Sequence, residues 1–214
     1  MKHAMRWNPQ IVLTVLGCVG LSLACGRPVQ DQREPGFYDI TAATGITFVH
    51  TDGSSGRHYL VETVTAGLGL FDYDNDGDLD IYFVNGADLP GQTSETPPTN
   101  ELWRNDGEFR FTNVTREAGV GDTGYGMGCV MGDIDNDGYL DIYVSNFRED
   151  VLYRNNGDGT FTDTTASAGL GDPRLGAGAC MADFNQDGWL DIFVANYIEC
   201  PLDTPAPCTR LGVP

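Results

Sequence analysis

Three short acidic segments carry oxygen-bearing side chains at a spacing typical of calcium ligands. Each follows the pattern D-x-[DN]-x-D-G-x-x-D, and the three begin at Asp72, Asp133 and Asp183. Calcium is a hard cation that takes roughly six to eight oxygen ligands. Side chains at positions 1, 3 and 5 converge only where the backbone curls around an ion, and glycine at position 6 tolerates the positive φ of such a turn. The pattern predicts up to three Ca²⁺ sites.

The predicted ligands are the side chains at positions 1, 3, 5 and 9 and the backbone carbonyl at position 7. Position 7 varies among Asp, Tyr and Trp, as a backbone ligand permits. The third loop has Asn185 in place of an aspartate, so we expect the weakest binding there. The full predicted set is Asp72, Asp74, Asp76, Asp78 and Asp80; Asp133, Asp135, Asp137, Tyr139 and Asp141; and Asp183, Asn185, Asp187, Trp189 and Asp191.

A second interpretation of these segments is a set of metal-free turns, because Asp-Gly pairs often form tight hairpins. Three loops with the same aligned oxygens favour the metal, since clustered carboxylates repel one another without a cation. The loops are not EF-hands, which need a bidentate Glu at position 12 and flanking helices. Position 12 is Phe83, Val144 or Val194, and β-forming residues follow position 9. Each loop is therefore expected to join two strands.

Each acidic loop belongs to a longer internal repeat. A second block of similar sequence, at 102–115 and 152–165, follows the first two loops. The first repeat is longer because of 86–101, a Pro/Thr/Ser-rich stretch that predicts a surface loop. Successive acidic loops begin 61 and 50 residues apart. About four short strands in a repeat of roughly this length are typical of a propeller blade. We therefore expect an all-β fold with β-propeller blades of four antiparallel strands, about two and a half blades in total.

The blocks define the expected organisation of the chain. Residues Phe37–Thr41 resemble the fourth-strand block of the repeats, which makes them a candidate ring-closing strand. The expected parts are a signal peptide (1–24), a linker (25–36), N-terminal strands (37–65), repeat 1 (66–115), repeat 2 (126–165) and a truncated repeat 3 (176–214).

The N-terminal segment predicts export. Lys2 and Arg6 precede an apolar run, Ile11–Ala24, which is too short to span a bilayer and is typical of a signal peptide. The run ends in Leu21–Cys25, which resembles a bacterial lipobox with Cys25 as the lipidated residue; ordinary cleavage at small residues is the alternative. We expect a secreted, periplasmic or outer-surface protein that meets the membrane only through an N-terminal lipid.

The net charge is −19, from 31 acidic and 12 basic residues. A field of this sign repels nucleic acid and anionic lipid, so we expect neither as a partner. Cys200 and Cys208 flank a Pro-rich loop and are expected to form a disulfide outside the cytosol. Cys129 and Cys180 lie in apolar strand-like runs and are expected to be buried thiols.

The repeats resemble the FG-GAP or VCBS repeats of integrin-α-like propellers. The resemblance rests on residues 45–50, 71–80 and 152–161. More specifically, the sequence resembles bacterial relatives of the cartilage acidic protein family, whose full-length members end in an ASPIC/UnbV domain. It implies a seven-bladed calcium-binding propeller used for extracellular interaction or adhesion. Because the sequence stops after the second strand of a third blade, we expect an N-terminal fragment.

Three functions follow as expectations. The first is a calcium-binding interaction or adhesion module without catalysis, which binds a protein or glycan. The second is a lectin that uses Trp103, Tyr153 or Trp189, although these aromatics equally suit the gaps between blades. The third, a polysaccharide-active enzyme, is disfavoured because the sequence has no nucleophile triad order, phosphate loop or His/Cys metal cluster. His50, His58 and Glu62 are expected to have structural or surface roles.

Overall fold

The computed structural model describes residues 37–57, 59–64 and 66–197. The signal peptide, the linker, Cys25, His58, the Cys200/Cys208 pair and the end of repeat 3 lie outside the described residues. The strands and helices all lie in one compact unit, Asp39–Pro214. Among the described residues, no helix is long and apolar enough to cross a membrane.

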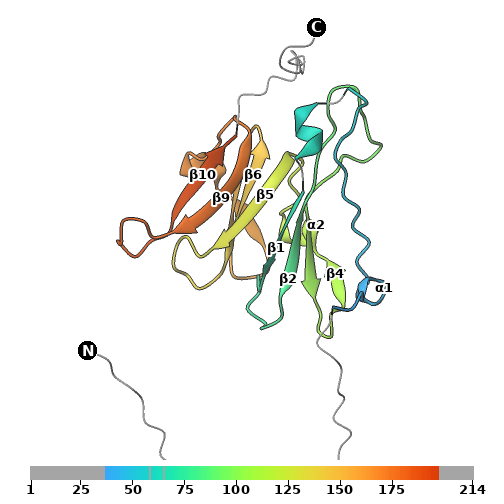
Figure 1. Ribbon diagram of the computed structural model, residues 1–214. Coiled ribbons are helices and arrows are strands. Elements are labelled where there is room, and N and C mark those ends of the chain that lie inside the picture. The colour runs from blue at the N-terminus through green and yellow to red at the C-terminus, as the bar shows by residue number, and fades with distance from the viewer. Residues whose placement is uncertain (1–36, 58, 65, 198–214) are drawn as a thin grey trace, which may run out of the picture. The chain divides into compact units, whose positions relative to one another are not determined.

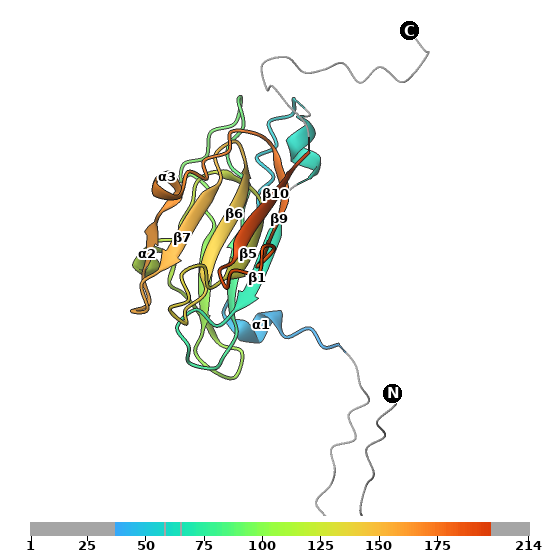
Figure 2. The same cartoon turned by 90° about the vertical axis from the view of Figure 1, so that its left-hand side faces the viewer.

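Two four-stranded antiparallel sheets and one two-stranded sheet make up the fold (Figures 1 and 2). In each four-stranded sheet the strands pair in chain order, as a meander. The strands are β1 (Gly67–Phe71), β2 (Asp80–Val84), β3 (Glu101–Asn105) and β4 (Phe111–Asn113); β5 (Tyr125–Gly132), β6 (Asp141–Phe147), β7 (Val151–Asn155) and β8 (Phe161–Asp163); and β9 (Gly176–Ala182) and β10 (Asp191–Asn196). The expected β-propeller blades of four antiparallel strands are confirmed.

Short helical turns link the sheets. The segments α2 (Thr115–Ala118) and α3 (Thr165–Ala168) follow the fourth strand of each complete sheet, and each ends at a glycine in the left-handed region. The N-terminal part differs from expectation. Its described residues contain α1 (Thr41–Thr44) and the 3₁₀ helix η1 (Leu60–Thr63) and no strand, so the predicted strands over 37–65 are corrected. Gly45 ends α1 in the left-handed conformation, as the glycines after α2 and α3 do.

The sheets pack through their first strands, β1 against β5 and β5 against β9. The small residues of these strands allow the close approach. A Cβ on Gly69 would lie 1.9 Å from Cε of Met131, and one on Gly132 would lie 2.6 Å from Sδ of Met181. These neighbours are the flexible ends of methionine side chains, whereas a Cβ on Gly67 would lie 3.2 Å from the backbone Cα of Gly128. The glycine-rich runs that enter the acidic loops therefore bring the first strands of neighbouring sheets close together.

The main hydrophobic core lies between the two complete sheets. It joins Phe71, Tyr82 and Leu102 of the first sheet to Ile142 and Tyr153 of the second. Along β2 buried residues alternate with half-buried ones, whereas every residue of β6 is buried.

The aromatic residues and the cysteines for which the sequence predicts similar burial differ in their exposure. Trp103 and Tyr153 are buried, whereas Trp189 is 52% exposed, so its expected packing between blades is wrong. Cys129 packs against the core, but Cys180 is exposed, so the prediction of a second buried thiol is also wrong. In the described part of the chain no fourth sheet packs against β9 on the side away from β5. This explains why Trp189 and Cys180 are exposed.

Candidate metal centre

The three acidic loops connect β1 to β2, β5 to β6 and β9 to β10. They lie at the same end of the three sheets (Figure 1). Because the three first strands pack side by side, their loops become neighbours. The sheet packing thus gathers loops that lie 50 or more residues apart in the sequence.

The first aspartate of each loop holds the loop backbone. Both carboxylate oxygens of Asp72 accept backbone hydrogen bonds, from the N–H groups of Asp76 (3.1 Å) and Gly77 (2.9 Å). Asp133 and Asp183 make the same pair of bonds in their own loops, at 3.0 and 2.9 Å in each. These local bonds fix the curl that the sequence pattern predicted.

The aspartate at position 9 attaches its loop to the sheet. Asp80 is fully buried, and its carboxylate accepts N–H bonds from Tyr73 in the loop (3.0 Å) and from Asn105 at the end of β3 (2.8 Å). Asp141 makes the same bonds with Ile134 and Asn155. Burial raises the pKa of Asp80 to about 6 and raises that of Asp141 as well, which burial of a carboxylate does in general.

The carboxylates of the first two loops converge. Ligand oxygens of Asp72, Asp74 and Asp76 lie within 4.8 Å of one another, and so do those of Asp133, Asp135 and Asp141. Asp80 does not join the group in the first loop, nor does Asp137 in the second.

A further observation indicates that these residues fit a calcium ion. Oδ1 of Asp74 and Oδ1 of Asp135, both at position 3, are buried and have no hydrogen-bond partner. A buried carboxylate oxygen without a donor is costly unless a cation satisfies it. Burial, followed by the nearby charge of Asp76, raises the pKa of Asp74. A bound Ca²⁺ would relieve both effects.

The third loop differs at position 3. The Asn185 amide donates to Asp187 (3.0 Å), and its carbonyl oxygen accepts the Asp187 N–H (2.8 Å). Among the described residues of this loop, no three carboxylates form a converging group. The predicted ranking, with the third site weakest, stays a prediction that this geometry favours.

Hydrogen bonds also connect each loop to the next one. The position-4 residues Asn75 and Asn136 have φ values of +61° and +57°, in the left-handed region that asparagine tolerates. The Asn75 amide donates to the carbonyl oxygen of Gly138 (3.0 Å), and the Asn136 amide donates to that of Gly188 (3.0 Å). The loops therefore form a hydrogen-bonded row across the three sheets.

An arginine of β7 enters the second loop. The Arg154 guanidinium forms ion pairs with Asp135 and, at 3.3 Å, with Asp137. The equivalent Arg104 of β3 instead pairs with Asp106 of its own turn at 2.7 Å.

Six of the twelve predicted side-chain ligands therefore lie in two converging groups. The expected backbone role of Asp78, Tyr139 and Trp189 stays a prediction. Sequence reasoning missed the loop-to-loop amides and Arg154. The repeated Asn at position 4 and the repeated Arg-Asn before the β3–β4 and β7–β8 turns were the available signals.

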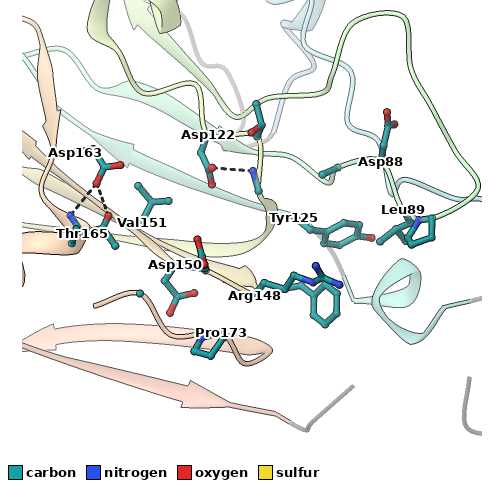
Figure 3. Close-up of a pocket in the computed structure, with 18 of the residues that line it drawn as sticks. Asp88, Leu89, Asp122, Tyr125, Arg148, Asp150, Val151, Asp163, Thr165 and Pro173 are labelled. Carbon is teal, nitrogen blue, oxygen red and sulfur yellow. Dashed lines mark hydrogen bonds between the residues drawn. The ribbon is translucent and has the colours of Figure 1, made fainter. Parts of the chain in front are cut away.

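The opposite ends of the sheets carry an open groove of about 1670 Å³ (Figure 3). Its walls come from the β2–β3 loop, the β4–β5 and β8–β9 connections, and the β6–β7 turn. Tyr125 and Phe147 form an edge-to-face aromatic pair beside it, and the Arg148 guanidinium lies 5.7 Å from the centre of the Phe147 ring.

The groove is acidic. Arg148 is the one basic side chain among its described lining residues, against the carboxylates of Asp88, Asp122, Glu149, Asp150 and Asp163. Asp150 is buried and accepts bonds from the Tyr143 hydroxyl and the Asn146 N–H. A lining of this sign repels anions and favours neutral or cationic ligands.

The meandering four-stranded sheets and the acidic loop between the first two strands of each define a propeller-repeat protein. The FG-GAP-like repeat matches the chain at residues 72–144 and 134–194, more than half of its length, and the chain belongs to this family.

Among solved structures, the chain is similar to a lectin from Agrocybe aegerita, described as recognising non-reducing terminal N-acetylglucosamine. The identity is 25% and the TM-score 0.37, with 61% of this chain and 33% of that chain covered. The chain thus spans about a third of the length of that structure. No curated protein matches the chain significantly.

Proposed function

We propose that the protein is a calcium-binding β-propeller module that binds a partner outside the cell and has no catalytic activity of its own. The observation that carries the calcium assignment is the pair of buried, unpartnered oxygens on Asp74 and Asp135, each inside a group of converging carboxylates. Calcium would fix each loop against its sheet. The export signal predicted over 1–24 supports the extracellular location.

The acidic groove is the proposed contact surface. It lies at the loop ends opposite the calcium loops, and its size is sufficient for a short peptide or an oligosaccharide. Its charge favours a neutral glycan or a cationic segment of a protein as the ligand. Membership of the cartilage acidic protein family, as the sequence resemblance implies, is consistent with such an interaction module.

Calcium titration by calorimetry tests the metal assignment. We expect heat of binding from the wild-type protein and a reduced number of sites in Asp72→Ala and Asp133→Ala. Asp158→Ala is a matched control, because Asp158 also precedes a glycine in a turn but lies outside the loops. Heat that is unchanged by the two loop substitutions would refute the calcium sites. A glycan array with and without chelator then separates a glycan ligand from a protein ligand.

A further inference from the structure

Arg104 and Arg154 stand at the same place in their repeats but have different partners. Each precedes an Asn-x-Gly turn, Asn105–Gly107 or Asn155–Gly157. Arg104 bonds to Asp106 through both Nε (2.8 Å) and Nη2 (2.7 Å). Arg154 instead bonds to Asp135 and Asp137, which are predicted ligands of the second loop.

One residue explains the difference. The x position of the turn is Asp106 in the first repeat and Asn156 in the second. Both side chains accept a hydrogen bond from the equivalent threonine of the next strand, Thr112 or Thr162. Only Asp106 carries a negative charge that can hold the arginine in its own turn. Asn156 is neutral, so Arg154 finds its counter-charge in the acidic loop.

This position of Arg154 affects the second calcium site directly. The guanidinium contacts one oxygen of Asp135, while the other oxygen is buried and unpartnered. A calcium ion bound to Asp135 and Asp137 shares those carboxylates with a fixed positive charge, and the two cations repel each other. In the described part of the chain no ion pair joins Arg104 to the first loop, where Arg104 interacts with the Tyr73 hydroxyl and acts on Asp74 only through its charge.

We propose that Arg154 is an intrinsic competitor of calcium at the second loop, and that the residue at position 106 or 156 sets whether the arginine competes. This inference rests on the proposed calcium function. In the absence of calcium, Arg154 partly neutralises the second loop. When calcium binds, the guanidinium leaves Asp135 and Asp137. The second site is consequently weaker than the first, although its five predicted ligand positions hold the same oxygen groups.

Reciprocal exchange of the turn residue tests the proposal. Asn156→Asp gives the second repeat the turn of the first, so Arg154 pairs with residue 156 and calcium binds the second loop more tightly. Asp106→Asn does the reverse in the first repeat. The expected change is about two- to fivefold in Kd in each case, the equivalent of one exposed ion pair. Each site is read by calorimetry with CaCl₂ in full-length protein whose other two loops are weakened by Asp→Asn at position 1.

A second readout follows the arginine itself. In chelator, the NMR signal of the Arg154 Nε–H reports the bond to Asp135, and it should shift on addition of CaCl₂ while that of Arg104 moves less. In Asn156→Asp the Arg154 signal should already be shifted before calcium is added.

The outcomes separate the two proposals. Absence of calcium binding to the wild-type protein defeats the calcium function and the inference with it. Calcium binding with unchanged affinity in Asn156→Asp and Asp106→Asn, or an Arg154 signal that does not respond to calcium, overturns the inference alone. Tighter binding in the first variant and weaker binding in the second supports it.

Discussion

The side-chain amide of Asn75 donates a hydrogen bond to the backbone carbonyl of Gly138, which lies in the acidic loop of the next sheet. Asn136 makes the same bond to Gly188 one sheet further on. Each amide comes from position 4 and each carbonyl from position 6, so a loop is held partly by its neighbour. The sheets thereby gain a polar connection between their acidic loops.

Removal of this connection should destabilise the protein. Asn75→Gly keeps a residue that accepts the positive φ but deletes the donor. We expect the free energy of unfolding to fall by about 0.5–1.5 kcal/mol, the usual net value of one hydrogen bond. Urea denaturation in chelator measures the change.

Gln186→Gly is the matched control for that variant. Gln186 holds the same position in the third loop, with φ of +64°, and in the described part of the chain its side chain bonds to no other loop. Any general effect of a new glycine appears in both variants. Equal losses in the two would show that the inter-loop bond contributes nothing.

The third loop should gain calcium affinity from a restored carboxylate. Asn185→Asp supplies the oxygen ligand that the other loops have at position 3, and calcium affinity rises with ligand charge. We expect about tenfold tighter binding at the third site, equivalent to about 1.4 kcal/mol. Calorimetry in a background with weakened first and second loops isolates this site. Gln186→Glu adds the same charge one residue away, so an equal gain there would argue for a general charge effect.

Asp150 should make stability depend on pH. Burial, and then the neighbouring Asp172 and Asp122 charges, raise its pKa against the opposing hydrogen bonds from Tyr143 and Asn146. The folded state therefore binds this proton more tightly than the unfolded state. The contribution is fully present below the ordinary carboxyl pKa of about 4 and is lost as pH rises through the raised value.

Comparison of the wild type with Asp150→Asn isolates the contribution of the Asp150 proton to the free energy of unfolding. Urea denaturation from pH 4 to 7 in chelator should show the variant gaining stability relative to the wild type as pH rises, by at most about 1.4 kcal/mol per pH unit. Asp158→Asn should stay close to parallel with the wild type over this range, because hydrogen bonds from Thr160 lower the pKa of Asp158 and its contribution changes mainly below about pH 4. A parallel pair of curves for wild type and Asp150→Asn would contradict the assignment.

The two described cysteines should differ in reactivity. Burial raises the pKa of the Cys129 thiol to about 12, whereas Cys180 is exposed on β9. Because the thiolate is the reactive form, iodoacetamide at pH 8 should modify Cys180 at least about tenfold faster than Cys129. Peptide mapping by mass spectrometry after timed quenching gives both rates. Similar rates would place Cys129 at the surface.

The sequence alone determined the repeat, the strand number per sheet and the local geometry of the acidic loops. These features depend on short-range physics: Asp72 bonds to residues four and five positions ahead, and glycine at position 6 permits the turn. Such contacts lie within one loop, so a nine-residue pattern is enough to predict them.

The tertiary structure decided what lies beyond each loop. The Asn75–Gly138 bond, the burial of Asp80 against β3 and the exposure of Trp189 and Cys180 depend on how the sheets stack. The N-terminal residues show the same limit, because the strand expected over Phe37–Thr41 has no partner strand there in the described part of the chain. The ion pairs of Arg154 with Asp135 and Asp137 likewise depend on how the end of β7 and the acidic loop of the same sheet lie in space. Residue spacing alone does not encode that contact.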